Sequence, residues 1–299
     1  MLYKNISEIP LNLEGRVAIK LHMGERGNKT HVSPQDVKVI FDRLRKMGCE
    51  PFLVDTTTLY PGSRYTREGY MKVAKENGFG GFPVVIAKDD EYIKKGAFKI
   101  AREILDADSL LVLSHGKGHG TTGFGGAIKN LGMGCVNRES KNYIHSPMIP
   151  VHDSSRCTQC LACERACFCH IITVKPEFRI DEKACCGCGY CIESCKTGAL
   201  HLKPRAVQDC FRLFSEAAKQ VIDSFGRVAY ITVLKNITEF CDCLSNPGKI
   251  VCQDIGYLSG KSSLEIDQEA VSLIKQKNPK ALDFETWNLF EREARKVFR

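Results

Sequence analysis

The sequence contains no apolar run of about 18 residues, which is the length that a membrane-spanning helix requires. Its first segment, MLYKNISEIPLNLEGR, lacks the apolar stretch and the small-residue cleavage site of a secretory signal peptide. The basic residues are scattered and form no stripe with interleaved aromatic residues, although the formal net charge is +8. We therefore expect a cytoplasmic protein with no membrane span and no nucleic-acid partner.

Cysteine, in contrast, is abundant. The chain has 16 cysteines in 299 residues, and ten of them fall between Cys157 and Cys195. In a secreted protein this number would indicate disulfides, whereas in a cytosolic protein it more often indicates metal binding or catalysis. The clustering of the cysteines in one short segment favours a metal.

Apolar and amphipathic segments alternate through the first 150 residues. Strands are expected at Val17–Met23, Phe52–Thr57, Pro83–Ala87 and Leu110–Ser114. Helices are expected at Pro34–Met47, Arg67–Asn77 and Glu91–Leu105. This alternation predicts an α/β fold with a mostly parallel sheet and flanking helices.

Residues 151–205 interrupt the alternation, because they have no long apolar run and are dense in cysteine. Helices are expected again at Val207–Ser224, Leu264–Lys275 and Phe284–Val297, and strands at Arg227–Leu234 and Lys249–Ile255. We expect a discontinuous α/β domain of residues 1–150 and 206–299 whose late strands join the first sheet. Residues 151–205 would form a small α+β insertion, and two wholly separate domains are the alternative.

The cysteine-rich segment contains an internal repeat. Residues 157–167 read CTQCLACERAC and residues 185–195 read CCGCGYCIESC, so both contain Cys-x2-Cys-x2-Cys-x3-Cys. Three closely spaced thiolates can reach three iron corners of one [4Fe–4S] cluster, and in two-cluster ferredoxins the fourth cysteine of each run binds the other cluster. We assign one cluster to Cys157, Cys160, Cys163 and Cys195, and the other to Cys185, Cys188, Cys191 and Cys167.

Residues 155–202 resemble the bacterial two-cluster ferredoxins. The resemblance implies two [4Fe–4S] clusters, and one departure is that Phe168 and Lys196 stand where that family usually has proline. A zinc site is the alternative, but zinc sites usually use four ligands in paired knuckles rather than eight in an interleaved pattern. Cys169 and Cys186 lie outside the pattern, and we expect them to be small buried residues.

A glycine-rich loop follows the strand that ends at Ser114. Ligands of open α/β sheets bind beyond the carboxyl ends of the strands, and glycines let backbone N–H groups approach a ligand. We expect His115 and His119 to bind a metal or move protons, and Lys117 to hold an anionic group. Further candidates for ligand contact are Gly123, Gly125, Gly126, Lys129 and Asn130. A weak G-x-G-x-x-G match leaves dinucleotide binding open, as well as a loop without a ligand.

Two more groups of residues are candidates for the same site. Cys241 and Cys243 are separated by one residue, so their sulfurs could bind a metal, form a redox dithiol or simply pack as buried cysteines. Strand alternation puts Lys20 and His22 on one face at the end of the first strand. They would converge with the His115 loop at the carboxyl edge of the sheet, or be unrelated polar residues at a strand end.

Three segments carry a resemblance that spans nearly the whole chain. They read VAIKLHMGERGNKTHVSP, GGAIKNLGMG and EFCDCLSNPGKIVCQDIGYL, and the cysteine repeat lies between the last two. They resemble the uncharacterised iron–sulfur centre proteins grouped as domain of unknown function 362. The resemblance implies an α/β domain with an inserted two-cluster ferredoxin, but no established reaction. Leu258–Asp267 reads LSGKSSLEID and departs from the family pattern, which predicts an altered or lost activity if this segment helps to build the site.

These observations lead to three hypotheses for the function. The first is an oxidoreductase of an oxygen-poor, reducing compartment that passes electrons between the clusters and a small molecule near His115, His119 and Cys241. The second is an electron carrier, whose α/β part serves as a docking surface for a redox partner protein. The third is a metal- or cofactor-handling protein with a third metal at Cys241 and Cys243.

Overall fold

A seven-stranded sheet forms the centre of the computed structural model, which describes residues 1–299. In spatial order its strands are β1 (Leu2–Tyr3), β17 (Gly256–Gly260), β14 (Val228–Leu234), β7 (Ser109–His115), β2 (Arg16–Lys20), β3 (Glu50–Asp55) and β4 (Val84–Ile86). The five strands from β14 to β4 are parallel, whereas β17 is antiparallel to both β14 and β1. The expectation of a mostly parallel sheet is confirmed, and β14 and β17, which follow the cysteine-rich segment, belong to it.

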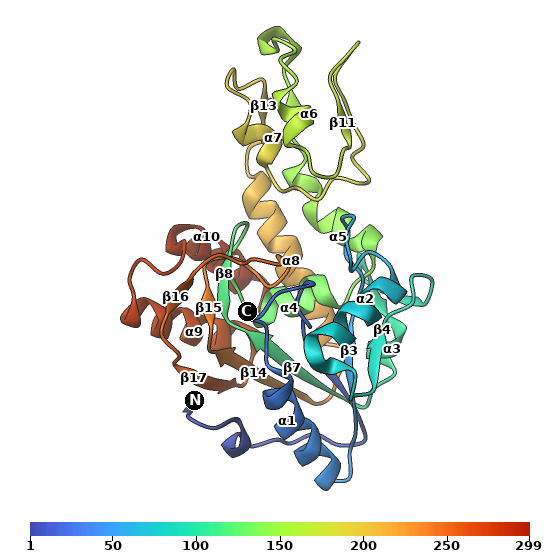
Figure 1. The fold of residues 1–299 in the computed structure, drawn as a ribbon, viewed down its shortest axis with the longest axis vertical. Coiled ribbons are helices and arrows are strands. Elements are labelled where there is room, and N and C mark those ends of the chain that lie inside the picture. The colour runs from blue at the N-terminus through green and yellow to red at the C-terminus, as the bar shows by residue number, and fades with distance from the viewer.

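Helices cover both faces of this sheet (Figure 1). The body contains α1 (Pro34–Lys46), α2 (Arg67–Ala74), α3 (Arg102–Leu105), α4 (Ala127–Gly134), α5 (Arg138–His145), α8 (Ala206–Ile222), α9 (Ser263–Lys277) and α10 (Phe284–Val297). Along β7, Leu110 and Val112 enter the core under α4, α8, α9 and α10, and Leu111 and Leu113 enter the core under α1 and α2. Burial on both faces explains why the strand is a continuous apolar run.

The ends of several helices follow from local chemistry. The Ser33 side chain accepts a hydrogen bond from the backbone N–H of Asp36 at the start of α1, where Pro34 is the first helical residue. The Asp283 side chain accepts one from Thr286 at the start of α10, whose bounds agree with the prediction. These helices could be predicted because their caps lie within a few residues of each other in the chain.

The helix expected at Glu91–Leu105 is wrong for most of its length. Strands β5 (Tyr92–Lys95) and β6 (Phe98–Ala101) form a hairpin there, and only the short helix α3 follows. Gly96 makes the turn with a φ of +57°, a left-handed conformation that suits glycine. The side chains of Phe98 and Ile100 alternate into the core, which is the period of a strand and not of a helix.

The strand expected at Lys249–Ile255 is shorter and lies elsewhere. Strand β16 (Ile250–Cys252) pairs with β15 (Ile237–Thr238) outside the main sheet. The main sheet instead receives β17, which begins at Gly256, where a Cβ atom would lie 2.5 Å from the carbonyl oxygen of Tyr3. The prediction missed β17 because the strand is defined by pairing with distant segments, β14 on one side and β1 on the other.

Shorter elements complete the body. They are η1 (Ile6–Glu8), the π turn η2 (Lys75–Phe79), η3 (Ser146–Met148), and a hairpin of β8 (Lys117–His119) with β9 (Gly123–Gly125). None of the helices combines the length and the apolar composition that crossing a membrane would require.

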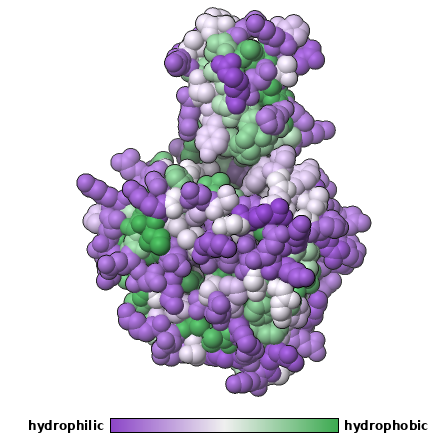
Figure 2. All heavy atoms as spheres, viewed as in Figure 1, coloured by the Kyte–Doolittle hydropathy of each residue, from purple (hydrophilic) through white to green (hydrophobic).

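Residues 151–201 form a lobe that projects from the body beyond α5 and α8 (Figure 1). It contains β10 (Val151–His152), η4 (Ser154–Arg156), α6 (Ala162–Ala166), β11 (Ile172–Thr173), β12 (Arg179–Ile180), α7 (Tyr190–Glu193) and β13 (Leu200–His201). Strand β10 pairs with β13, and β11 pairs with β12. The lobe has its own small apolar core, and a hollow separates it from the body in the space-filling view (Figure 2).

Candidate functional site

Two cavities in the lobe are lined by cysteines. The first is lined by Cys157, Cys160 and Cys163 of the first repeat together with Cys195 of the second. The second is lined by Cys185, Cys188 and Cys191 of the second repeat together with Cys167 of the first, and by Cys169 and Cys186, which lie outside the repeat pattern. None of the eight repeat thiols forms a disulfide. The two sets are the ones assigned from the interleaved spacing, and a set of four thiols fits the ligand requirement of a [4Fe–4S] cluster.

The backbones of the two repeats match, although their sequences differ. Gly187 and Gly189 have φ values of +63° and +83°, and the residues 28 positions earlier, Gln159 and Leu161, have φ values of +52° and +64°. Residues other than glycine rarely adopt this left-handed backbone conformation. Strained residues of this kind concentrate at ligand-binding sites. The strain at Gln159 and Leu161 is thus part of a loop shape that both repeats adopt.

The cysteines outside the repeat pattern also lie in the lobe. Cys169 and Cys186 are half-buried rather than fully buried, and their sulfurs are 3.9 Å apart at the second cavity. Phe168 is 45% exposed and packs against Tyr190 of α7, with ring centroids 6.2 Å apart. The ring of Phe168 also lies 6.1 Å from that of Tyr60, which belongs to the body.

A second group of polar residues gathers at the carboxyl edge of the sheet. His115 ends β7 and is buried, and its Nδ1 lies 2.9 Å from Asp242 while its Nε2 lies 2.8 Å from the carbonyl oxygen of Lys235. Lys117 lies 3.2 Å from Asp242 as well. Burial raises the pKa of Asp242, but the neighbouring His115 and Lys117 outweigh it and hold that pKa well below its usual value. Both ring nitrogens of His115 thus have partners within the protein, Asp242 for Nδ1 and the Lys235 carbonyl oxygen for Nε2.

Arg64 connects several of these segments, and the sequence interpretation missed it. Its guanidinium lies 2.9 Å from Glu25, 2.7 Å from Nε2 of His22 and 3.1 Å from the Tyr60 hydroxyl. The Nη2 atom is also 3.5 Å from the carbonyl oxygen of Cys243. In the sequence, Arg64 is marked only by its place in a polar loop after a buried strand. Most of its partners are far away in the chain, so the sequence did not point to its role.

Lys20 belongs to a different network beneath this edge. Its Nζ lies 3.0 Å from Asp55 and donates a 2.7 Å hydrogen bond to Asn130, so two predicted ligand contacts meet there. The Tyr70 hydroxyl donates to Asp55 as well. Lys20 is 1% exposed, and it has partners other than those of His22, although both follow the same strand.

The glycines of the β8–β9 hairpin allow close packing. A Cβ atom at Gly123 would lie 2.3 Å from the carbonyl oxygen of Asp283, and one at Gly126 would lie 2.2 Å from Oδ1 of Asp267. Helix α4 begins at Ala127, directly beyond the hairpin. Asp267 accepts hydrogen bonds from the N–H groups of Ala127 and Ile128 at that helix start.

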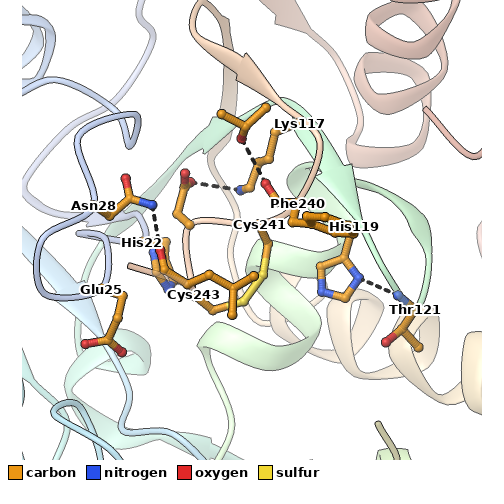
Figure 3. Close-up of a disulfide and its surroundings, with 12 residues drawn as sticks. His22, Glu25, Asn28, Lys117, His119, Thr121, Phe240, Cys241 and Cys243 are labelled. Carbon is orange, nitrogen blue, oxygen red and sulfur yellow. Dashed lines mark hydrogen bonds and ion pairs between the residues drawn. A yellow bond between two sulfur atoms is a disulfide. The ribbon is translucent and has the colours of Figure 1, made fainter. Parts of the chain in front are cut away.

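The remaining candidates surround a disulfide between Cys241 and Cys243 (Figure 3). His119 offers a ring nitrogen near the two sulfurs, and the three potential ligand atoms lie within 4.8 Å of one another. These three residues could therefore hold a metal ion if the sulfurs were reduced. Lys129 lies 4.9 Å above the Phe214 ring and has no ion pair. Gly125 lies in the same region, because a Cβ atom added there would contact the side chains of Lys117 and His119.

The molecule is thus an α/β protein with a cysteine-rich lobe above the carboxyl edge of its sheet. The chain matches the family described as Domain of unknown function (DUF362) over residues 17–272, and it belongs to that family. The resemblance to domain of unknown function 362 in the three sequence segments is therefore confirmed.

Comparison with solved structures gives only distant similarity. The lactate racemase apoprotein from Thermoanaerobacterium thermosaccharolyticum is 12% identical with a TM-score of 0.45, over 91% of this chain and 56% of that one. A protein from Thermotoga maritima is 11% identical with a TM-score of 0.45, over 91% of this chain and 57% of that one. The chain spans little more than half the length of these proteins, and no curated protein matches it.

Proposed function

We propose that this chain is an iron–sulfur redox protein that binds two [4Fe–4S] clusters in a ferredoxin-like insertion, residues 151–205. The observation that carries the proposal is the grouping of the eight repeat cysteines around two cavities, three from one repeat and one from the other at each, with Cys169 and Cys186 also at the second. This grouping is the ligand pattern of two-cluster ferredoxins. The shared left-handed positions of the two repeats support it, since a cluster-binding loop needs one defined shape.

The residues around the cysteines have separate tasks in this proposal. When bound, each cluster supplies a centre that takes up or releases one electron. Leu161, Val174 and Phe178 line the first cavity and limit the access of water to it. The exposed rings of Phe168 and Tyr190 lie beside ligands of the second set, where a redox partner protein can approach.

A line of direct contacts favours an oxidoreductase over an isolated electron carrier. Phe168 follows the ligand Cys167 and packs on Tyr60, whose hydroxyl accepts a hydrogen bond from Arg64. The same Arg64 nitrogen reaches the backbone of Cys243. Phe168, Tyr60 and Arg64 therefore link the second set of cysteines to Cys243 at the carboxyl edge of the sheet. Ligands of α/β proteins bind at this edge.

The test is anaerobic purification of the full chain followed by iron and sulfide analysis. We expect about eight iron atoms and about eight sulfides per chain, with a paramagnetic resonance signal after reduction. The variants Cys160→Ser and Cys188→Ser should each lose about half of the iron, because each removes a ligand of one cluster. The matched control is Cys49→Ser, a buried cysteine of the body whose thiol donates a hydrogen bond to the carbonyl oxygen of Leu13.

Two results would contradict the proposal. One is colourless protein without sulfide that contains zinc at the cysteines. The other is equal iron loss in Cys49→Ser and Cys188→Ser, because that would mean that the cysteines act only through the general stability of the fold.

A further inference from the structure

The Cys241–Cys243 disulfide does not have the features of a structural cross-link. The two cysteines are only two positions apart, and a cross-link stabilises a fold less when the loop that it closes is shorter. The segment is also held without it, because buried Asp242 pairs with His115 and Lys117, and the backbone oxygen of Asp242 accepts a hydrogen bond from Glu25. The fold therefore gains little from the S–S bond.

The same anchoring sets the position of the sulfurs. Asp242 is 1% exposed and points into the protein, while Cys241 and Cys243 on either side of it are half-buried. The two sulfurs lie side by side, within reach of His119. In Figure 3 the His119 ring turns toward the disulfide on the side away from Thr121. A thiol pair that solvent reaches and the protein positions suits redox chemistry better than packing.

The hydrogen bonds of His119 define what it can offer to the sulfurs. Its Nδ1 accepts hydrogen bonds from the backbone N–H groups of Thr121, at 3.0 Å, and Thr122, at 3.3 Å. A neutral imidazole that accepts at Nδ1 carries its proton on Nε2. The ring therefore presents an N–H donor to the sulfurs, which suits a thiolate, whereas a metal would need a lone pair at that position.

Cations surround the same pair. Burial lowers the pKa of His119, and the nearby charges of Lys129 and Lys117 lower it further, while Arg64 contacts the backbone of Cys243. Asp242, which stands between the two cysteines in the chain, already pairs with Lys117 and is hydrogen-bonded to His115. An electropositive, partly accessible setting of this kind stabilises a thiolate.

We propose that Cys241 and Cys243 form a two-electron redox centre that exchanges electrons with the lobe, an inference that rests on the proposed function. In the reducing direction the S–S bond breaks, and the pair takes up one proton from water and two electrons, which bound clusters would supply one at a time. The products are one thiol and one thiolate, and the thiolate accepts the Nε2–H hydrogen bond of His119. In the opposite direction the S–S bond forms again, and two electrons and one proton leave.

The first test counts electrons in the full-length protein, purified without oxygen and titrated with a one-electron viologen dye. Wild type should take up about four electrons, two for the clusters and two for the disulfide, and the double variant Cys241→Ser/Cys243→Ser about two. The control Cys252→Ser removes a nearby buried free cysteine and should keep the count of about four. An equal count in wild type and the double variant would overturn the proposal.

The second test follows the sulfurs themselves by alkylation and peptide mass spectrometry. Both sulfurs should be blocked in oxidised protein and become alkylated after the dye is added. In Cys188→Ser the dye should fail, whereas a phosphine that supplies two electrons directly should still open the pair. Sulfurs that alkylate equally before and after reduction, or that retain one metal ion per chain, would contradict a redox centre. Iron analysis of the same samples reports the clusters separately, so loss of the clusters is distinguishable from loss of the pair.

The third test concerns His119. Without its hydrogen bond the reduced pair is less stable, so His119→Leu should lower the reduction potential of the pair. The expected change is about tenfold in the equilibrium constant, or about 30 mV for a two-electron couple. His119→Gln keeps an N–H donor and should recover most of the shift. Equal potentials in wild type and His119→Leu would show that His119 has no such role.

Discussion

Asp267 is a single residue on which the start of a helix depends. It belongs to α9, but both of its carboxylate oxygens accept hydrogen bonds from the first N–H groups of α4, Ala127 and Ile128. Gly126 makes this approach possible, since any side chain there would collide with the carboxylate. Asp267 also ends the segment Leu258–Asp267 that departs from the family pattern. Burial raises the pKa of Asp267 to about 7, although the two N–H groups oppose this change.

This raised pKa predicts a pH dependence of stability. Since the folded state holds the proton more tightly than the unfolded state, the contribution of Asp267 to the free energy of unfolding is largest below about pH 4 and is lost as the pH rises to about 7. Relative to Asp267→Asn, wild type should gain about 2 kcal/mol between pH 7.5 and pH 5.

Urea unfolding followed by the fluorescence of Trp287, the single tryptophan, measures the difference. Trp287 is buried and packs on Phe124, close to the hairpin that leads into α4. A wild-type minus variant difference that does not change between the two pH values would contradict the prediction.

At the scale of elements, the contact of α4 with α8 depends on the absence of a side chain. A Cβ atom at Gly132 would lie 2.4 Å from the carbonyl oxygen of Phe214, a distance that atoms in proteins do not adopt. Helix α4 carries Lys129 and Asn130, so the spacing of these two helices positions residues at the carboxyl edge of the sheet.

Gly132→Ala is therefore expected to destabilise the protein by about 1–3 kcal/mol, because the two helices must move apart. Helix propensity alone predicts the opposite, a gain of up to about 1 kcal/mol, so the sign of the change separates the two effects. The control is Gly120→Ala, where a Cβ atom meets nothing within 4 Å. Thermal unfolding gives both values, and a stabilised Gly132→Ala would mean that the helix contact is not tight.

For the whole molecule, the important difference is between the cores of the body and the lobe. The body has two apolar clusters of 39 and 24 buried residues, whereas the cluster of the lobe has five. Two of these five, Cys167 and Cys191, are proposed iron ligands. A core this small rarely supports a fold by itself, and metal binding then supplies the folding free energy.

Removal of iron by a chelator, without oxygen, should therefore unfold the lobe and leave the body folded. Hydrogen exchange should become fast across residues 151–201, while β7 and α8 remain protected. The unfolding transition reported by Trp287 should stay within about 1 kcal/mol of that of the iron-loaded protein. Loss of protection in β7 together with the lobe would mean that the two parts fold as one unit.

Local patterns in the sequence predicted much of this protein. The caps of α1 and α10, the apolar runs of β2, β3, β7 and β14, and the repeat of cysteines all depend on residues close together in the chain. A left-handed loop with three cysteines is likewise a local feature, so the grouping of ligands could be proposed before any contact was known.

Only the tertiary structure decided the rest, because the deciding contacts are long-range. Asp242 meets His115 across 127 positions, Asp267 meets Ala127 across 140, and Arg64 meets Cys243 across 179. The local sequence around each of these residues is ordinary, and their roles follow from burial with a distant partner of the right charge. The cysteines of the lobe and the Cys241–Cys243 pair could therefore be singled out in the chain, whereas the partners that hold the pair in place, Asp242 and Arg64 among them, became visible only when the strands were assembled.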